Sequence, residues 1–251
     1  MNDFLVNCRN IFVPFYDCST ENGIDNAIRL GYSLQDIIAE HNIYERYVGP
    51  RSICYDIGAY VGTHSILFAL LGAQVYSFEP SPFNYPRLKQ NCLPFNQIKT
   101  FDIAFHEKEY DIVTKFKDCT SAQHNAGREQ LIKYRIFDKF IKDNNLCFPD
   151  FMKVDIEGME TVLLKTLRDI LKKNKTVIYV ELHPKPLEMM DLNRYDDNPN
   201  WLFINEGGYD FNELKDYNLR YYKSISNKDF EEIDKSYDFN TLDGALVLVP
   251  K

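Results

Sequence analysis

The sequence has few of the features that would place it in a specialised protein class. Among its 251 residues no apolar run approaches the roughly 18 residues that a bilayer-crossing helix needs. The N-terminus, MNDFLVNCRN, does not have the basic and then apolar layout of a signal peptide. The six cysteines form no CxxC pair and no metal-finger spacing. We therefore expect a cytoplasmic protein with reduced thiols and no membrane segment.

Positive charge is also scarce. The chain has 29 Lys and Arg against 37 Asp and Glu, a formal net charge of −8. Proteins that bind nucleic acids hold the phosphate backbone mainly with Lys and Arg, so we expect no nucleic-acid partner. The hydrophobic content of 45% is enough for a core. Nothing in the composition predicts the oligomeric state.

Strands and helices are expected to alternate along most of the chain. This order predicts an α/β fold with a doubly wound, mostly parallel, seven-stranded sheet and helices on both faces. The expected core strands are 52–57, 73–80, 98–105, 150–158 and 176–184, with extra strands at 10–17, 110–116 and 241–251. The expected helices are 25–47, 62–72, 83–91, 128–143 and 159–173.

A turn containing glycines follows the first core strand, in CYDIGAYVGTHS (54–65). Gly58 and Gly62 allow a tight turn and a close approach to a ligand at the carboxyl end of the strand. A dinucleotide fingerprint also has glycine at the central position, where this chain has Tyr60, so pyrophosphate binding is disfavoured. Asp56 would repel a phosphate but suits the ammonium group of an amino acid.

The second core strand ends in an acid. Glu79 stands where a carboxylate can bind both hydroxyls of a ribose, although it could also be a solvated acid at a strand end. An amino acid at one strand end and a ribose at the next together indicate S-adenosylmethionine.

Five segments in a fixed order carry a family resemblance. YDIGAYVGTHS, FEPSPFNYPRLKQN, FDIAFHEKE, FMKVDIEGMETVLLKTL and YVELHP resemble the FkbM-type methyltransferases, which are class I S-adenosylmethionine-dependent enzymes. The resemblance covers about residues 50–185 and the closing strand. It implies O-methylation, commonly of hydroxyls on sugars or on glycosylated and polyketide products.

The resemblance also implies roles for residues at the strand ends. Asp56, Gly58 and Gly62 would line the methionine end of the cofactor, Glu79 would hold the ribose, and residues 102–105 would lie beside adenine. The predicted cofactor-binding set is completed by Ala59, Tyr60, His64, Asp102 and Ala104. Several of these have simpler explanations: Tyr60 could only cover the cofactor, His64 could face solvent, and Asp102 could be a turn former.

The resemblance suggests how the single methyltransferase domain, residues 1–251, is divided. Residues 1–50 are expected to be an N-terminal extension and 51–183 the cofactor-binding core. Residues 184–243 are expected to form an aromatic-rich insertion that faces the substrate. Residues 244–251 form the closing strand.

Charged residues occupy a strand that should be buried, in FMKVDIEGME (151–160). Lys153, Asp155 and Glu157 alternate, so they share one face of the strand. Burying such groups is costly unless they are paired or functional. Glu181 and His183 end the neighbouring strand and also share a face. We expect Lys153 to neutralise a carboxylate and Glu181 to support the site.

This cluster leaves two mechanisms open. In the first, Asp155 or Glu157, with His183 as the other candidate, is a general base. In the second, Asp155, Glu181 and His183 hold Mg²⁺ or Mn²⁺. We favour the metal-free base, because the spacing alone does not fix a coordination geometry.

The sequence thus predicts an S-adenosylmethionine-dependent O-methyltransferase that acts on a hydroxyl of a sugar or glycoconjugate. A methyltransferase of nucleic acid or protein is the main alternative, and the net charge disfavours it. An NAD-dependent sugar oxidoreductase on the same fold is disfavoured by Tyr60. A non-catalytic cofactor-binding scaffold would leave the charged strand unexplained.

Overall fold

The structure is a computed structural model of the whole chain, and it describes most of the central core together with several peripheral strands. The described residues are 4–8, 11–15, 40, 42–115, 129–156, 160, 163–164, 166–167, 173–182, 217–225, 229–233 and 244–251.

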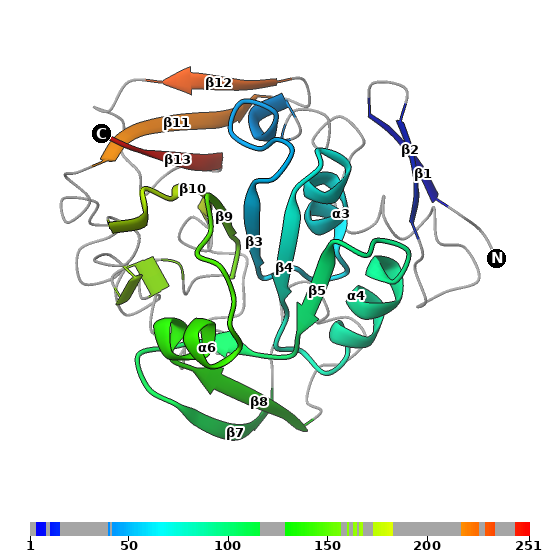
Figure 1. Cartoon of the computed structure of the whole chain (residues 1–251), viewed down its shortest axis with the longest axis vertical. Helices are drawn as coiled ribbons and strands as arrows, with labels where there is room; N and C mark the ends of the chain where they lie inside the picture. Colours follow the sequence, from blue (N-terminus) through cyan, green and yellow to red (C-terminus); the bar gives the residue numbers. More distant parts are fainter. Residues whose placement is uncertain are drawn as a thin grey trace, which may run out of the picture.

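One large sheet organises the chain (Figure 1). Its strands are β3 Ile53–Ile57, β4 Gln74–Phe78, β5 Ile98–Phe101, β9 Phe151–Val154, β10 Val177–Leu182, β11 Tyr217–Ile225, β12 Asp229–Ile233 and β13 Gly244–Pro250. Their order across the sheet is β12-β11-β13-β10-β9-β3-β4-β5. The five strands from β10 to β5 run parallel, whereas β13 is antiparallel to both of its neighbours and β12 is antiparallel to β11.

This topology confirms the doubly wound, mostly parallel α/β fold. In the described part of the chain the sheet has eight strands, one more than the seven predicted, because β12 pairs with β11 at its edge. The predicted closing strand is β13, which lies between β10 and β11. Part of the predicted insertion, residues 184–243, therefore belongs to the main sheet as β11 and β12, whereas residues 184–216 lie outside the described part of the chain.

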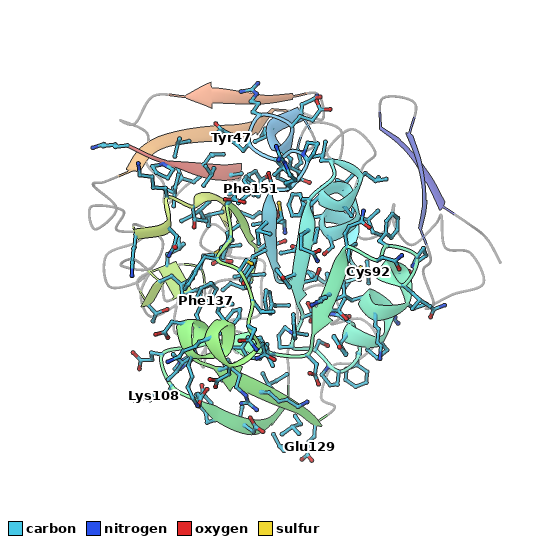
Figure 2. All side chains as sticks on the ribbon, viewed as in Figure 1. Tyr47, Cys92, Lys108, Glu129, Phe137 and Phe151 are labelled. Carbon is cyan, nitrogen blue, oxygen red and sulfur yellow. The ribbon has the colours of Figure 1, made fainter. Side chains whose placement is uncertain are left out.

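Helices cover both faces of this sheet. Helices α3 (Thr63–Leu70) and α4 (Tyr85–Cys92) pack on one face together with residues 43–48. Helix α6 (Phe137–Asp143) packs on the other face, with the helical residues 163–167 that are described. A hydrophobic core lies on each face: Phe151 belongs to the core on the α3 face and Phe137 to the core on the α6 face, and both are labelled in Figure 2. The sheet thus separates two cores, as a doubly wound fold requires.

The part of the sequence between β5 and β9 forms a second, smaller sheet. It contains β6 (Ala104–Phe105), β7 (Tyr110–Lys115) and β8 (Glu129–Arg135) in the order β6-β8-β7. The predicted helix 128–143 is therefore wrong over 129–135, and only α6 is helical. The physical reason is pairing with other strands: the whole of β7 pairs with β8, and Tyr134 stacks on Tyr110 with ring centroids 4.7 Å apart.

The N-terminal region contributes a hairpin and part of a helix. Strands β1 (Phe4–Cys8) and β2 (Ile11–Phe15) pair with each other, and β2 confirms the strand expected at 10–17. Of the helix expected at 25–47, residues 40 and 42–44 are helical, while 16–39 and 41 lie outside the described residues. Within the described ranges, no helix has both the length and the apolar character that crossing a bilayer demands.

Candidate active site

The glycine turn after β3 lies directly against the end of β9. Gly58 has a φ of +81°, and a Cβ placed on it would be 1.7 Å from the backbone oxygen of Asp155, so only glycine fits there. The amide of Asp155 donates a hydrogen bond to the carbonyl of Ile57 at 3.0 Å. The predicted cofactor turn therefore contacts the backbone of the residue that carries the candidate catalytic carboxylate.

The same turn is also tied to the end of β4. The amides of Gly58 and Ala59 both donate to the carbonyl oxygen of Phe78 at 3.0 Å. Tyr60 has a φ of +50°, uncommon for a residue with a side chain, and Gly62 at φ +97° precedes the first residue of α3. The five residues from 58 to 62 thus form a rigidly held, tightly curled connection.

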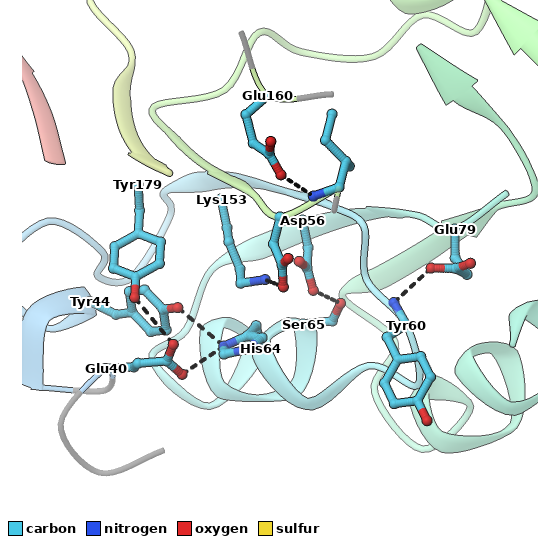
Figure 3. A network of polar contacts seen from close by, with 12 residues as sticks. Glu40, Tyr44, Asp56, Tyr60, His64, Ser65, Glu79, Lys153, Glu160 and Tyr179 are labelled. Carbon is cyan, nitrogen blue, oxygen red and sulfur yellow. Dashed lines mark hydrogen bonds and ion pairs between the residues drawn. The ribbon is translucent and has the colours of Figure 1, made fainter. Parts of the chain in front are cut away.

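Glu79 is buried and has a fixed orientation (Figure 3). Its Oε2 accepts a hydrogen bond from the amide of Tyr60 at 2.9 Å, and its Oε1 accepts one from the amide of Ser81 at 2.9 Å. These two bonds fix the plane of the carboxylate. A carboxylate oriented in this way beside the turn is suited to bind a vicinal diol.

Asp56 lies beneath the turn and is fully buried. Its Oδ2 accepts a hydrogen bond from Ser65 Oγ at 2.5 Å, and Ser65 is in turn hydrogen-bonded to Ser77 at 2.7 Å. Burial raises the pKa of Asp56, while the charge of Lys153 and the bond from Ser65 oppose that rise. Sequence reasoning missed both serines, although a small polar residue in the otherwise apolar VYSF strand was a usable signal.

Lys153 and Asp155 form the expected ion pair. Lys153 Nζ donates to Asp155 Oδ2 at 2.7 Å; the lysine side chain is fully buried and that of Asp155 is 12% exposed. Burial alone would lower the pKa of Lys153, but the charges of Asp155, Asp56 and Glu181 outweigh it and raise that pKa. The lysine is therefore a permanent buried cation.

His64 does not face solvent, as one sequence interpretation allowed; it is 4% exposed. Its Nδ1 lies 3.1 Å from the hydroxyl of Tyr44 and 3.5 Å from Oε2 of Glu40. Tyr179 donates a hydrogen bond to Glu40 Oε1 at 3.2 Å. Burial, with the nearby charge of Lys153, lowers the pKa of His64 well below its ordinary value, so the ring is neutral at pH 7.

The side chains of His64, Glu40, Tyr44 and Tyr179 lie beside the Lys153 ammonium group, as Figure 3 shows. Glu40, Tyr44 and Tyr179 were not among the predicted site residues. Their contacts join segments far apart in the sequence, so no local motif could predict them.

The remaining predicted residues fall into two groups. Asp102 is half-buried and forms an ion pair with Lys133 of β8 at 2.5 Å, and Ala104 is half-buried in β6. Their proximity to adenine stays a prediction. Glu157 and His183 lie outside the described residues.

Glu181 is half-buried at the end of β10 and contributes to the electrostatic field at Lys153. The described residues contain no cluster of three His, Cys, Asp or Glu that could hold a metal ion. His183, one of the three candidate ligands, is not among them, so the metal alternative stays open.

Several known proteins are similar to this chain in sequence or in structure. Hexuronic acid methyltransferase AglP from Haloferax volcanii is 27% identical in an alignment 143 residues long, and the alignment covers 52% of this chain and 56% of AglP. The chain thus spans about half the length of this curated relative. A solved methyltransferase FkbM from Methylobacillus flagellatus is 17% identical with a TM-score of 0.47, and the likeness covers 84% of this chain and 51% of that one.

A third similar protein is the O-methyltransferase from Bacillus cereus, solved in complex with SAH. It is 13% identical with a TM-score of 0.49, and the likeness covers 94% of this chain and 84% of that one.

The family comparison gives a firmer result. The family described as the methyltransferase FkbM domain matches residues 56–214, from the aspartate of β3 to a point beyond β10. This match spans more than half of the 251 residues. The chain therefore belongs to the FkbM family of methyltransferases.

Proposed function

We propose that the protein is an S-adenosylmethionine-dependent O-methyltransferase that acts on a hydroxyl of a sugar or glycoconjugate. The observation that carries this proposal is the contact between the turn at Gly58 and the backbone of Asp155, with Glu79 held beside the same turn. It brings Glu79, the candidate ligand for the ribose hydroxyls, and Asp155, a candidate base, to one edge of the sheet. Membership of a methyltransferase family and the named activity of the hexuronic acid relative support it.

The residues of the turn fit the proposed cofactor. Glu79 would bind the ribose hydroxyls, and the backbone from Gly58 to Gly62, with Ala59 and Tyr60, would surround the methionine portion. Asp56 Oδ1 is buried and has no hydrogen-bond partner in the described part of the chain, which suits an ammonium donor. When bound, the cofactor supplies a methyl group on a positively charged sulfur.

The chain's own contribution is to orient the acceptor and remove its proton. Asp155, held by Lys153, is the leading candidate for the general base, with Glu157 and His183 as the other candidates. General-base catalysis typically contributes about 10²- to 10⁴-fold in rate. Alignment of the acceptor oxygen with the methyl group contributes further, because it converts the encounter into an intramolecular step.

A metal-assisted mechanism is the second candidate for the chemical step. Asp155, Glu181 and His183 would hold Mg²⁺ or Mn²⁺, whose preferred ligands are mainly oxygen atoms. We favour the metal-free base because the ion pair already engages one oxygen of Asp155 with Lys153.

Two other activities have less support. Methylation of nucleic acid or protein is the alternative acceptor class, and the net charge of −8 disfavours the first of these. An NAD-dependent oxidoreductase is disfavoured by the methyltransferase family of the chain. We also propose that residues 184–243 face the substrate and that the protein acts in the cytoplasm.

A methyl-transfer screen tests the proposed function. The full chain is incubated with methyl-labelled S-adenosylmethionine and with sugars, nucleotide sugars, oligosaccharides, RNA or protein. We expect label in a carbohydrate hydroxyl, and label found only in RNA or protein would overturn the acceptor class. Activity that EDTA abolishes and Mg²⁺ or Mn²⁺ restores would select the metal mechanism.

A further inference from the structure

Three polar side chains form a row across the centre of the main sheet. In the strand register, Tyr179 of β10 pairs with Lys153 of β9, which pairs with Asp56 of β3. Side chains in register on parallel neighbours point to the same face. All three residues are buried, so the row is enclosed between the sheet and the layer that contains α3.

The segment before β3, which includes Glu40 and Tyr44, packs over this row on the same face of the sheet. Glu40 is 7% exposed, and its carboxylate bridges the hydroxyl of Tyr179 on β10 and the ring of His64 on α3. Tyr44, one helical turn further along, is hydrogen-bonded to the same ring. The Glu40 carboxylate thus links the segment before β3 to α3 and to β10.

The candidate catalytic pair is electrostatically coupled to this network. The charges of Lys153 and Asp155 both act on His64, and Asp155 also acts on Tyr179. Burial and the charge of Glu40 raise the pKa values of Tyr44 and Tyr179, so both phenols stay protonated and able to donate. Tyr179 is in register with Lys153, and the polar groups of the network lie beside the ammonium group that binds Asp155 (Figure 3).

We propose that Glu40, Tyr44, His64 and Tyr179 form a positioning network that holds Lys153, and through it Asp155, in the geometry that methyl transfer requires. The segment from Glu40 to Val48 is then a working part of the site rather than an appendage, and its buried residues Ile43, Tyr44 and Val48 join the same core as α3. This inference rests on the proposed function. It concerns residues that position the reacting group and do not touch the acceptor.

A buried network of this kind has a simpler explanation, because it could only satisfy polar groups and stabilise the fold. The two explanations differ in what a minimal substitution changes. A stabilising network affects the folded fraction, whereas a positioning network affects turnover in molecules that are already folded.

The test uses Glu40→Gln and Tyr179→Phe in the full chain, with Tyr55→Phe as the matched control. Tyr55 is equally buried and its hydroxyl donates one hydrogen bond, to the carbonyl of Cys147 at 2.7 Å, but it lies in the opposite core. We expect both network variants to lower kcat by about 10- to 100-fold, with the cofactor Kd unchanged. Tyr55→Phe should keep the parent kcat.

A double variant shows whether the effect runs through Asp155. Glu40→Gln should add little to the loss of kcat already caused by Asp155→Asn, because both act on the same group. If the losses of kcat in the two single variants multiply in the double variant, the proposal is overturned. Parent-like kcat in both network variants, or an equal loss in Tyr55→Phe, would overturn it as well. A parent chain that transfers no methyl group would instead overturn the proposed function on which the network depends.

Discussion

The two faces of the main sheet are built from the same strands and both bury apolar side chains, but the α3 face also buries the charged row of Asp56 and Lys153. On the α6 face Tyr55, Phe78, Phe105 and Phe137 pack ring against ring, with successive centroids 5.3, 4.8 and 4.9 Å apart. On the α3 face the next residue after Tyr55 is the buried acid Asp56. Strand alternation alone sends these neighbours to opposite sides.

This difference separates stability from chemistry. Aromatic burial stabilises a fold at no electrostatic cost, whereas each buried charge must recover several kcal/mol through its partners. The buried Asp56 and Lys153 are neighbours on the α3 face, close to the glycine turn, and they mark this face as the candidate working face of the sheet. The comparison predicts that substitutions on the two faces will fail in different ways.

The largest expected effect is on turnover. Asp155→Asn is nearly isosteric, so it should keep the fold and the cofactor affinity while lowering kcat by about 10²- to 10⁴-fold. Asp111→Asn is the matched control, because Asp111 is also ion-paired, with Arg135, but lies in the small sheet. Steady-state kinetics on both variants checks this, and full activity in Asp155→Asn would make that residue structural.

The next effect is on stability and tests the two faces directly. Lys153→Met leaves buried carboxylates without their cation and should cost about 3 to 5 kcal/mol of unfolding free energy. Phe137→Ala leaves a cavity in the opposite core and should cost a similar amount, about 3 to 5 kcal/mol. Denaturant unfolding measures both losses.

Activity per folded molecule then separates this pair of variants. It should survive in Phe137→Ala and be lost in Lys153→Met. Equal residual activity in the two variants would remove the distinction between the faces.

Cofactor affinity should change by a smaller amount. Glu79→Ala removes a carboxylate that two backbone amides orient, and it should weaken cofactor binding by about 1.5 to 3 kcal/mol, the scale of hydrogen bonds to a charged group. Calorimetry with S-adenosylhomocysteine measures this directly. Glu109→Ala, at an exposed ion pair with Lys139, serves as control, and parent-like affinity in Glu79→Ala would show that the acid is only structural.

The smallest effect concerns pH. Unfolded His64 binds a proton near its ordinary pKa of 6.5, whereas burial keeps the folded ring neutral at that pH. The unfolded state then binds more protons below pH 6.5, so this group makes the fold less stable as pH falls, by at most about 1.4 kcal/mol per pH unit. The raised pKa of Asp56 acts in the opposite direction.

A comparison of melting temperatures isolates the histidine. Between about pH 7.5 and 5.5 the parent should lose more stability than His64→Gln does. Identical slopes in the two proteins would mean that folding does not lower the pKa of His64.

The sequence predicted the parts of this molecule that local patterns encode. The alternating strands and helices, the glycine turn and the pairing of Lys153 with Asp155 all follow from periodicity or from residues two apart. The strand at 129–135 was missed because its pattern also suits a helix, and only pairing with a distant strand decides between them. Glu40 was missed because its partner Tyr179 is 139 residues away.

The close contact at Gly58 has a consequence for chimeras made from members of the family. The segments 56–62 and 153–155 meet backbone to backbone, so the shape of one limits what the other can be. Exchanging only one of them between relatives would combine surfaces that never adapted to each other. A chimera designed to change the acceptor should therefore transfer both segments as one block, or leave both in place and alter residues outside them.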